Sequence, residues 1–398
     1  MTPLSNHPLA SSAFPTSDPP LGMGTLAVHG AISFTGDGPP AGSPISAPLH
    51  QSVTFTDLPG QYPRYGHHPN ADRVQQRIAA LEGAEAALVT SSGLGATACT
   101  MMALLRPGDH LLASSWIYGG TRQFFEVDLR RAGVEVDLID PTETRGWRRA
   151  LRHNTRVIFL ENPVNPTARV LDTRAIEPLA DEHGIAVVCD STFASPINYQ
   201  PLQHGVDVVI HSATKYLNGH HDVMLGVVCG TAPFVDEAAQ VMRRWGQAPD
   251  PFACWMLDRS LKTLEVRVLR QNATAQTLAE RLAAHPRVTA VHYPGLSSHP
   301  DHALARTLLS GFGSMLGVEV AGGVDAAEKV MSRLRLFARA GSLGSVDSLA
   351  SEPRLTSHAD LTATERAAIG APDGFIRLSV GLESPEDLWR DLQLALED

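Results

Sequence analysis

The chain carries a lysine shortly after an apolar run, in Val206-Asp207-Val208-Val209-Ile210-His211-Ser212-Ala213-Thr214-Lys215-Tyr216. Lys215 is one of only three lysines in 398 residues, whereas 29 of the 32 basic residues are arginines. Arginine stays protonated in proteins, but a lysine that is removed from water can lose its proton and attack a carbonyl carbon. The stretch therefore indicates covalent chemistry at Lys215, and the alternative is an ordinary surface lysine in a loop.

Short apolar strands of the same kind precede this stretch, and helical patterns separate most of them. The strands are predicted at Glu85–Thr90, His110–Ala113, Val134–Ile139, Val157–Leu160, Ile185–Cys189 and Val206–Ile210. The helices are predicted at Val74–Leu81, Gly93–Leu105, Thr121–Ala132, Thr144–Arg152 and Thr173–His183. Continuously apolar strands that alternate with helices are typical of a mostly parallel sheet covered on both faces, so we expect an α/β fold.

The last third of the chain has a different pattern. It predicts one long, kinked helix over Leu257–His285, strands around Ser314–Val320 and Phe375–Val380, a helix over Ala326–Arg335, and a final helix that begins at Ser384-Pro385. Segregated helices and strands indicate a smaller α+β domain. We therefore expect three parts: an N-terminal tail and arm over residues 1–64, a large domain over 65–256, and a small C-terminal domain over 257–398.

Composition excludes several classes of partner. The net charge of −10 and the dispersed basic residues argue against nucleic acid or an anionic membrane as a partner. No apolar run reaches the roughly 20 residues that span a bilayer. Residues 1–20 lack the pattern of a signal peptide and predict a loose tail. The four cysteines, which form no C-x-x-C pair, are expected to be thiols of a reducing cytoplasm, most of them in the core.

Polar residues gather where the predicted strands end. Ser91-Ser92-Gly93 opens a helix, Tyr118 follows the next strand, and Asn165, Asp190 and Lys215 follow three others. Each has an ordinary explanation as a turn or cap. Together they match the requirements of pyridoxal 5'-phosphate (PLP), because parallel strands place their carboxyl ends at one edge. A lysine bonds the aldehyde, a carboxylate pairs with the pyridine nitrogen, an aromatic stacks on the ring, and N–H groups hold the phosphate.

From about Leu26 to its end, the chain resembles the trans-sulfuration (Cys/Met metabolism) PLP-dependent enzymes, which include cystathionine γ-synthase, cystathionine γ-lyase and methionine γ-lyase. The matching stretches are Tyr62-Pro63-Arg64-Tyr65-Gly66, Thr90-Ser91-Ser92-Gly93, Tyr118-Gly119-Gly120-Thr121, Glu161-Asn162-Pro163-Val164-Asn165-Pro166, Asp190-Ser191-Thr192-Phe193, Ser212-Ala213-Thr214-Lys215-Tyr216-Leu217-Asn218-Gly219-His220, Ser342-Leu343-Gly344 and Arg377-Leu378-Ser379-Val380-Gly381. The resemblance implies the PLP-dependent transferase fold type I, like that of aspartate aminotransferase.

The resemblance also implies a role for each matching residue. Lys215 and Tyr118 would be catalytic: the lysine would bond the cofactor and move protons, and the tyrosine would stack on the ring and assist the leaving group. The other cofactor-binding residues would be Tyr62, Arg64, Gly93, Leu94, Asp190, Thr192, Ser212 and Thr214. Of these, Tyr62 and Arg64 would reach into the neighbouring subunit of a homotetramer built as a dimer of dimers. The substrate carboxylate would be held by Asn165, Ser342 and Arg377.

Three departures from the family pattern bear on specificity. The segment Tyr65-Gly66-His67-His68-Pro69-Asn70 is one residue longer than the usual Tyr-Gly-Asn-Pro-Thr. Gly120 stands where methionine γ-lyases commonly have cysteine. Gly341 stands where cystathionine γ-synthases and γ-lyases often have a glutamate that is thought to bind the distal amino group. The pairs His67-His68 and His220-His221 lack further ligands at metal-binding spacing, so no metal is expected.

The expected activity is γ-elimination or γ-replacement on sulfur-containing or homoserine-derived amino acids, with cystathionine γ-synthase or γ-lyase as the first named reaction. Methionine γ-lyase, cystathionine β-lyase, homoserine sulfhydrylase and a biosynthetic γ-replacement stay open. An aminotransferase of the same fold is disfavoured by the Tyr118-Gly119-Gly120-Thr121 and Ser342-Leu343-Gly344 matches. A regulator or catalytically inactive binding protein is disfavoured by the intact Lys215 and Asp190.

Overall fold

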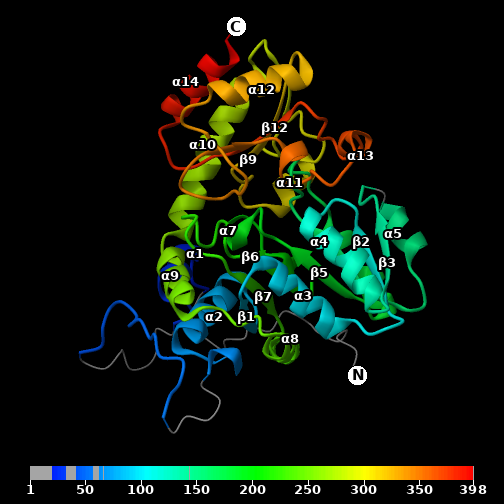
Figure 1. Ribbon diagram of the computed structural model, residues 1–398, viewed down its shortest axis with the longest axis vertical. Helices are drawn as coiled ribbons and strands as arrows, with labels where there is room; N and C mark the ends of the chain where they lie inside the picture. Colours follow the sequence, from blue (N-terminus) through cyan, green and yellow to red (C-terminus); the bar gives the residue numbers. More distant parts are fainter. Residues whose placement is uncertain (1–19, 33–41, 57–61, 66, 143, 398) are drawn as a thin grey trace.

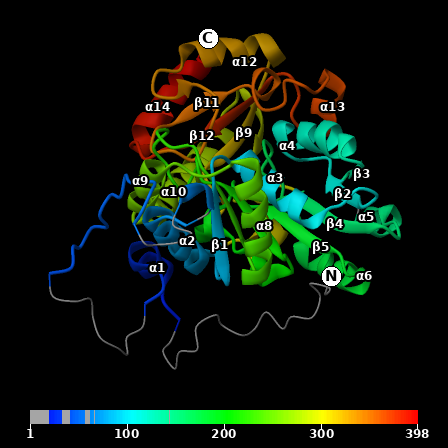
Figure 2. The same cartoon turned by 60° about the horizontal axis from the view of Figure 1, so that its bottom comes forward.

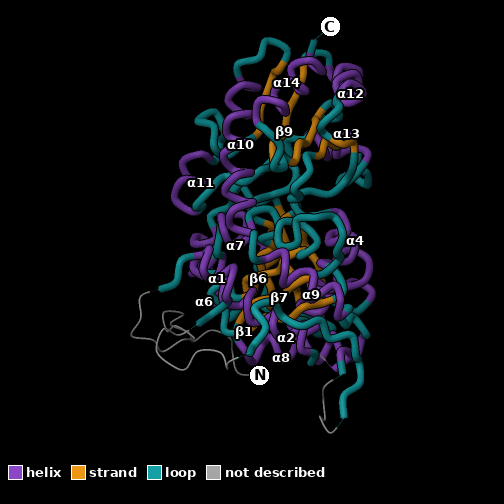
Figure 3. Tube along the Cα trace, turned by 90° about the vertical axis from the view of Figure 1, so that its left-hand side faces the viewer, coloured by secondary structure: helices purple, strands orange, loops and turns teal. Residues whose placement is uncertain are grey.

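The computed structural model describes residues 20–32, 42–56, 62–65, 67–142 and 144–397. Two β-sheets lie at different levels along the long axis of the molecule, the larger one below and the smaller one above (Figures 1 and 3). The tail at residues 1–19 and Gly66 of the lengthened loop lie outside the described residues. The predicted domain limits at 64/65 and 256/257 stay predictions.

The large sheet has seven strands in the order β1-β7-β6-β5-β4-β2-β3. These are β1 (Ala86–Thr90), β2 (His110–Ser114), β3 (Glu135–Ile139), β4 (Thr155–Glu161), β5 (Ala186–Asp190), β6 (Val208–Ser212) and β7 (Gly226–Gly230). Only β7 runs antiparallel to its neighbours, so the sheet is mostly parallel, as predicted. The sequence analysis missed β7, because only three apolar residues stand between its two glycines.

Helices cover both faces of the large sheet (Figure 2). One face buries apolar side chains of α2 (Pro69–Glu82), α6 (Glu177–His183) and α9 (Pro251–Leu261). The other face buries those of α3 (Gly93–Leu104), the π-helical segment η2 (Phe124–Leu129) and α8 (Ala232–Trp245). Short elements complete this part: α4 (Gly119–Gln123), α5 (Thr144–Ala150), η3 (Thr173–Ala175), α7 (Ser195–Asn198) and η4 (Pro201–His204). The predicted helix over Thr121–Ala132 is therefore divided between α4 and η2.

The small sheet has five strands in the order β10-β11-β12-β9-β8. They are β8 (Val288–His292), β9 (Met315–Val320), β10 (Ala338–Arg339), β11 (Leu349–Ser351) and β12 (Phe375–Ser379). Apolar side chains of α10 (Leu264–Ala283), α12 (Gly323–Arg333) and α14 (Pro385–Leu396) form its core. The remaining elements are α11 (His302–Leu308), η5 (Pro353–Leu355) and α13 (Ala363–Ala368). The predicted strands correspond to β9 and β12, whereas the short or half-exposed β8, β10 and β11 were missed.

The predicted single helix over Leu257–His285 is wrong, because the chain breaks between α9 and α10 at Lys262 and Thr263. The Ser260 carbonyl accepts hydrogen bonds from the Thr263 hydroxyl at 3.1 Å and from the Arg267 guanidinium at 3.1 Å. The backbone N–H of Thr263 also donates to this carbonyl at 3.2 Å, a tighter turn than that of an α-helix, and α9 ends there.

The N-terminal arm contains short regular elements that were not predicted from the sequence. A short helix, α1 (Met23–His29), packs against the body through Arg77, which donates to the carbonyl of Ala27 at 2.8 Å. A 3₁₀ turn, η1 (Pro63–Tyr65), precedes α2. Between them, residues 42–56 form no regular helix or strand and run along the outside of the molecule (Figures 1 and 2).

Candidate active site

Lys215 lies in a turn that follows β6, and a side chain of α10 hydrogen-bonds to the backbone of this turn. The Arg267 guanidinium, which is 3% exposed, donates to the carbonyls of Tyr216 at 2.8 Å and Leu217 at 3.2 Å. Gly219 closes the turn with φ of 75°, and a Cβ there would lie 2.1 Å from Arg267 Nη1. The sequence analysis did not identify Arg267, because its place on a separate helix gives no local signal.

The amine of Lys215 meets residues from the small sheet. Its Nζ donates to Ser342 Oγ at 2.9 Å. Burial and, secondarily, the charge of Arg377 lower the pKa of Lys215. Both effects favour the neutral amine, which is the form that attacks a carbonyl or accepts a proton. The structure thus supplies the desolvation that the sequence argument for Lys215 required.

Ser342, Asn165 and Arg377 converge on one point. Arg377 on β12 donates from Nη1 to Asn165 Oδ1 at 2.9 Å and from Nη2 to the Ser342 carbonyl at 2.9 Å. Its Nε is buried and has no hydrogen-bond partner among the described residues. Burial lowers the pKa of Arg377 to about 10. A buried guanidinium with an unused donor fits a carboxylate, so the three residues fit the predicted role of binding the substrate carboxylate.

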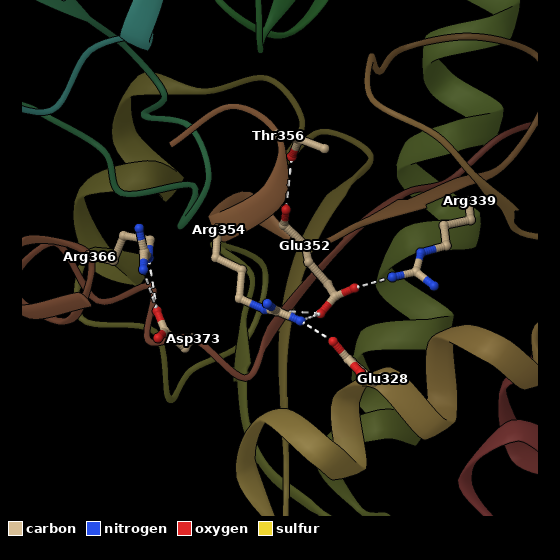
Figure 4. Close-up of polar contacts among 7 residues, drawn as sticks. All are labelled: Glu328, Arg339, Glu352, Arg354, Thr356, Arg366 and Asp373. Carbon is tan, nitrogen blue, oxygen red and sulfur yellow. Dashed lines mark hydrogen bonds and ion pairs between the residues drawn. The ribbon is translucent and has the colours of Figure 1, made fainter. Parts of the chain in front are cut away.

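Ser342 has a left-handed backbone, with φ of 91°, which costs a non-glycine residue about 1–3 kcal/mol. Nearby contacts hold the preceding chain: Arg339 on β10 donates to the buried Glu352 at 2.8 Å (Figure 4). Glu352 also binds Arg354 at 2.9 Å, and Arg354 contacts Glu328 on α12. This network anchors the strand that leads to Ser342.

Asp190 ends β5 and faces the same edge of the sheet. Burial raises its pKa, and the hydrogen bonds from Thr192 oppose this shift. The Thr192 backbone donates to Asp190 Oδ1 at 3.0 Å, and the Thr192 hydroxyl accepts from the Ser212 N–H at 2.8 Å. A buried carboxylate of this kind gains stability from a cationic partner, as a protonated pyridine nitrogen would provide.

Three of the predicted cofactor-binding residues, Gly93, Leu94 and Ser212, lie at the N-terminus of α3. Ser92 caps this helix by accepting from Gly95 N at 3.0 Å. A Cβ at Gly93 would lie 2.8 Å from the Ser212 Cβ, so only glycine permits this approach. Leu94 is exposed at the same end of the helix. The Thr214 hydroxyl is bonded to the backbone of Leu225, as donor at 3.2 Å and acceptor at 3.1 Å.

Tyr118 precedes α4, and its side chain is 49% exposed. Its backbone N–H donates to the buried Glu161 at 2.9 Å. A Cβ at Gly120 would lie 2.6 Å from Tyr118 Cε1, so a larger residue there would shift the ring. Glu161 was quoted within a sequence motif but was given no role, and the signal for it is an acidic residue at the end of an apolar strand.

Tyr62 and Arg64 are not brought to the lysine within this chain. Both are exposed, and they contact Tyr65: the Tyr62 and Tyr65 ring centroids lie 5.5 Å apart, and the Arg64 guanidinium lies 5.3 Å from the Tyr65 ring. Their predicted role in a neighbouring subunit stays a prediction. In the rest of the lengthened loop, His68 caps α2 by accepting from Asn70 N at 3.3 Å.

The structure gives three further results for the described part of the chain. No group of three or more His, Cys, Asp or Glu side chains there has the arrangement of a metal site. Among its helices, none combines the length and apolar character needed to cross a membrane. All four cysteines are buried free thiols.

The donor set fits PLP. A desolvated lysine, a half-buried carboxylate, a half-exposed aromatic and a glycine-opened helix lie at the edge of one sheet, at Lys215, Asp190, Tyr118 and Gly93. The Gly93–Ser212 contact brings the Ser212 side chain to the N-terminus of α3, where backbone N–H groups and the helix dipole favour a phosphate. A guanidinium with one unused donor completes the set on the substrate side, at Arg377.

Comparisons with known proteins agree with this geometry. The sequence-family model of the Cys/Met metabolism PLP-dependent enzymes matches residues 47–397 of this chain. The L-methionine gamma-lyase of Pseudomonas putida is 38% identical over 391 residues, which cover 94% of this chain and 97% of that protein. The cystathionine beta-lyase of Coxiella burnetii is 38% identical and covers 88% and 93%, respectively. The solved cystathionine gamma synthase of Xanthomonas oryzae pv. oryzae, in complex with cystathionine, has a TM-score of 0.89 and 36% identity, covering 95% and 98%.

These matches confirm the predicted resemblance, the type I fold and the cofactor. The named activities of the relatives include both lyases and synthases, as the sequence analysis expected.

Proposed function

Because the chain belongs to the Cys/Met metabolism PLP-dependent enzymes, we propose that it catalyses γ-elimination or γ-replacement on a homoserine- or homocysteine-derived amino acid. The observation that carries the proposal is the meeting of Lys215 with Ser342 and of Ser342 with Arg377, at 2.9 Å each. This places a proton-accepting amine beside a carboxylate-binding fork, as chemistry at the α-carbon of an amino acid requires.

The bound cofactor supplies an electron sink for charge that develops on the substrate carbons. The residues of the chain do the remaining work. The Arg377 fork, with Asn165 and Ser342, orients the substrate carboxylate. Lys215 would remove the α-proton and move a proton at the β-carbon, so that the γ-substituent can leave. Tyr118, which is half-exposed, would assist proton transfer to that leaving group.

Two glycines beside the proposed site residues bear on the choice of γ-substituent. At Gly341, no atom lies within 4 Å of an added Cβ, so this position offers space and no charge. At Gly120, an added Cβ would meet the Tyr118 ring. We therefore propose that the distal group of the substrate need not be cationic. We also propose that the Tyr118 ring keeps the position that Gly120 allows, where methionine γ-lyases commonly have a cysteine.

We further propose that the site is completed by a second subunit, through Tyr62 and Arg64, and that two such dimers form a tetramer. The exposure of both side chains and the position of residues 42–56 along the outside of the molecule support this arrangement. The four buried thiols suit a reducing compartment, and we propose the cytoplasm.

The test is a substrate survey with the PLP-loaded protein. Cystathionine, methionine, homocysteine and O-acylated homoserines are incubated separately, with and without cysteine as a nucleophile. Mass spectrometry follows the 2-oxo acid, thiol and γ-replacement products. Release of 2-oxobutanoate indicates γ-elimination, and pyruvate indicates β-elimination. Conversion that strictly requires a 2-oxo-acid acceptor would mean an aminotransferase and would refute the proposal.

A further inference from the structure

Glu161 is a buried carboxylate at the centre of the site for which the proposed chemistry has no step. It ends β4 and is aligned in register with Asp190, which ends the neighbouring parallel strand β5. Partners in register point their side chains to the same face, and neighbouring strands lie about 4.8 Å apart. Glu161 is only 5% exposed. The buried Glu161 and the half-buried Asp190 therefore lie side by side.

The carboxylate of Glu161 connects two separate parts of the site. Its Oε2 accepts the N–H of Tyr118 at 2.9 Å, and its Oε1 accepts the N–H of Asn165 at 2.9 Å. Tyr118 follows β2, whereas Asn165 follows β4 itself. The Asn165 side chain in turn accepts from Arg377 at 2.9 Å. One side chain thus sets the distance between the exposed aromatic and the carboxylate fork.

Ionisation of Glu161 costs free energy in this arrangement. Burial and then the neighbouring Asp190 raise the pKa of Glu161 to about 8, while the two backbone N–H groups and the charge of Arg377 act in the opposite direction. Glutamine would avoid the repulsion, but only one of its two terminal atoms accepts hydrogen bonds, while its NH2 group donates, so it cannot accept both N–H groups in the same way. The carboxyl group of Glu161 offers one oxygen to each N–H group at a fixed separation.

We propose that Glu161 is a positioning residue of the active site, which holds the backbones of Tyr118 and Asn165 in one arrangement and so aligns the ring-stacking tyrosine with the substrate-carboxylate fork. It acts through these two residues, and the structure shows no direct contact between Glu161 and Lys215. The inference rests on the proposed function for what Tyr118 and Asn165 do, but not for the contacts themselves.

The experiment compares Glu161→Gln with Asp391→Asn in the full-length, PLP-loaded protein. Asp391 is a matched control, because it is also buried and accepts backbone N–H groups, from Arg335 at 2.8 Å and Leu336 at 2.9 Å, but lies in the small domain. Hydrogen–deuterium exchange, read by mass spectrometry with residue-level fragmentation, reports on the amides of Tyr118 and Asn165. Cofactor affinity and kcat/KM are measured in parallel.

In Glu161→Gln, exchange at one or both amides should rise at least about tenfold, because an acceptor is lost, while the rest of the large domain is unchanged. We expect kcat/KM to fall by roughly 10- to 100-fold, the usual range for losing a supporting contact, and the affinity for PLP to weaken. Asp391→Asn should lower thermal stability and leave these readouts unchanged. Unchanged exchange at both amides, a uniform rise over the whole large domain, or kcat/KM within twofold of wild type would each overturn the proposal.

Two further arms keep the test decisive. If Glu161→Gln does not fold, Glu161→Asp keeps the carboxyl group but is one methylene shorter, and the same criteria apply. Rapid exchange of both amides in the wild-type protein would overturn the proposal without any variant. If the wild type converts none of the candidate amino acids, the proposed function fails, but the exchange and cofactor-affinity results still decide the role of Glu161.

Discussion

The Nζ of Lys215 lies 2.9 Å from the Oγ of Ser342, although 127 positions separate the two residues. Lys215 follows the last parallel strand of the large sheet, and Ser342 lies between the paired strands β10 and β11 of the small sheet. The site therefore depends on how the two sheets are held together. The strained φ of 91° at Ser342 is maintained by Arg377, whose guanidinium donates to the Ser342 carbonyl.

Lys215→Ala should bind PLP without covalent attachment. The wild-type protein should show a visible absorption band that borohydride reduction shifts, and peptide mapping should find the pyridoxyl group on Lys215. The variant should lack both signals and lose more than about 99% of its activity, because the base and the covalent anchor are the same group. Lys262→Ala, at the end of α9, is the control and should behave like wild type. A pyridoxyl group on Lys262 or Lys329 would show that the assignment is wrong.

Arg377→Lys should weaken substrate binding more than it changes folding. Lysine keeps the charge but cannot bind Asn165, the Ser342 carbonyl and a carboxylate at once, because it lacks the fork of five donors. We expect KM for the amino acid to rise by roughly 10- to 100-fold, since a charged hydrogen bond is worth about 1.5–3 kcal/mol. Steady-state kinetics measures this, with thermal melting as the check on folding. An unchanged KM would place the substrate carboxylate elsewhere.

Two buried histidines should make the protein sensitive to acid. His299 and His358 are 4% and 2% exposed, and burial lowers the pKa of each to about 4. In the unfolded chain both take up protons near pH 6.5, so stability is fully present above that pH and is lost as the pH falls towards 4. Each contributes at most about 3 kcal/mol over this window. Urea unfolding at several pH values measures the slope.

The matched variants are His299→Gln, His358→Gln and, as the exposed control, His153→Gln. The first two should flatten the loss of unfolding free energy between pH 6.5 and 4, and the control should not. Equal slopes in all four proteins would show that neither buried histidine governs the acid sensitivity.

The sequence predicted most of the large sheet because its parallel strands are buried on both faces and read as apolar runs. It missed β7, whose apolar run is short, and β8, which is half-exposed. The lysine, aspartate and arginine of the site were predicted with their local motifs. Arg267 was not, because its role comes from contacts to backbone groups about 50 positions away, which no local pattern encodes. Glu161 has a local signal, an acidic residue at the end of an apolar strand, but its contact with the Tyr118 backbone is 43 positions away and could not be predicted.

Mixing two inactive variants tests the shared site. Arg64→Ala removes an exposed residue that is proposed to act in the neighbouring subunit, and Lys215→Ala removes the nucleophile. In a hybrid dimer, one of the two sites receives both an intact Arg64 and an intact Lys215. We therefore expect the mixture to recover up to about a quarter of wild-type activity after subunit exchange, if the two kinds of subunit pair at random. Mass spectrometry of differently tagged subunits proves the exchange. Exchange without recovered activity would count against a site built from two subunits.

Gly341 offers the sharpest test of specificity. Its backbone is not left-handed, and an added Cβ would meet no atom within 4 Å, so Gly341→Glu should fold normally. Gly341 is exposed, so a carboxylate beside Ser342 would form a solvent-screened pair with a distal ammonium group, which contributes up to about 1 kcal/mol, or about fivefold in preference. We expect the wild type to accept an uncharged γ-thioether as well as cystathionine, and Gly341→Glu to shift kcat/KM towards cystathionine. Gly341→Gln, which is similar in size but uncharged, is the control for volume. A wild type that strongly favours cystathionine, with no shift in the glutamate variant, would refute the idea and direct attention to the His67–Asn70 segment before α2.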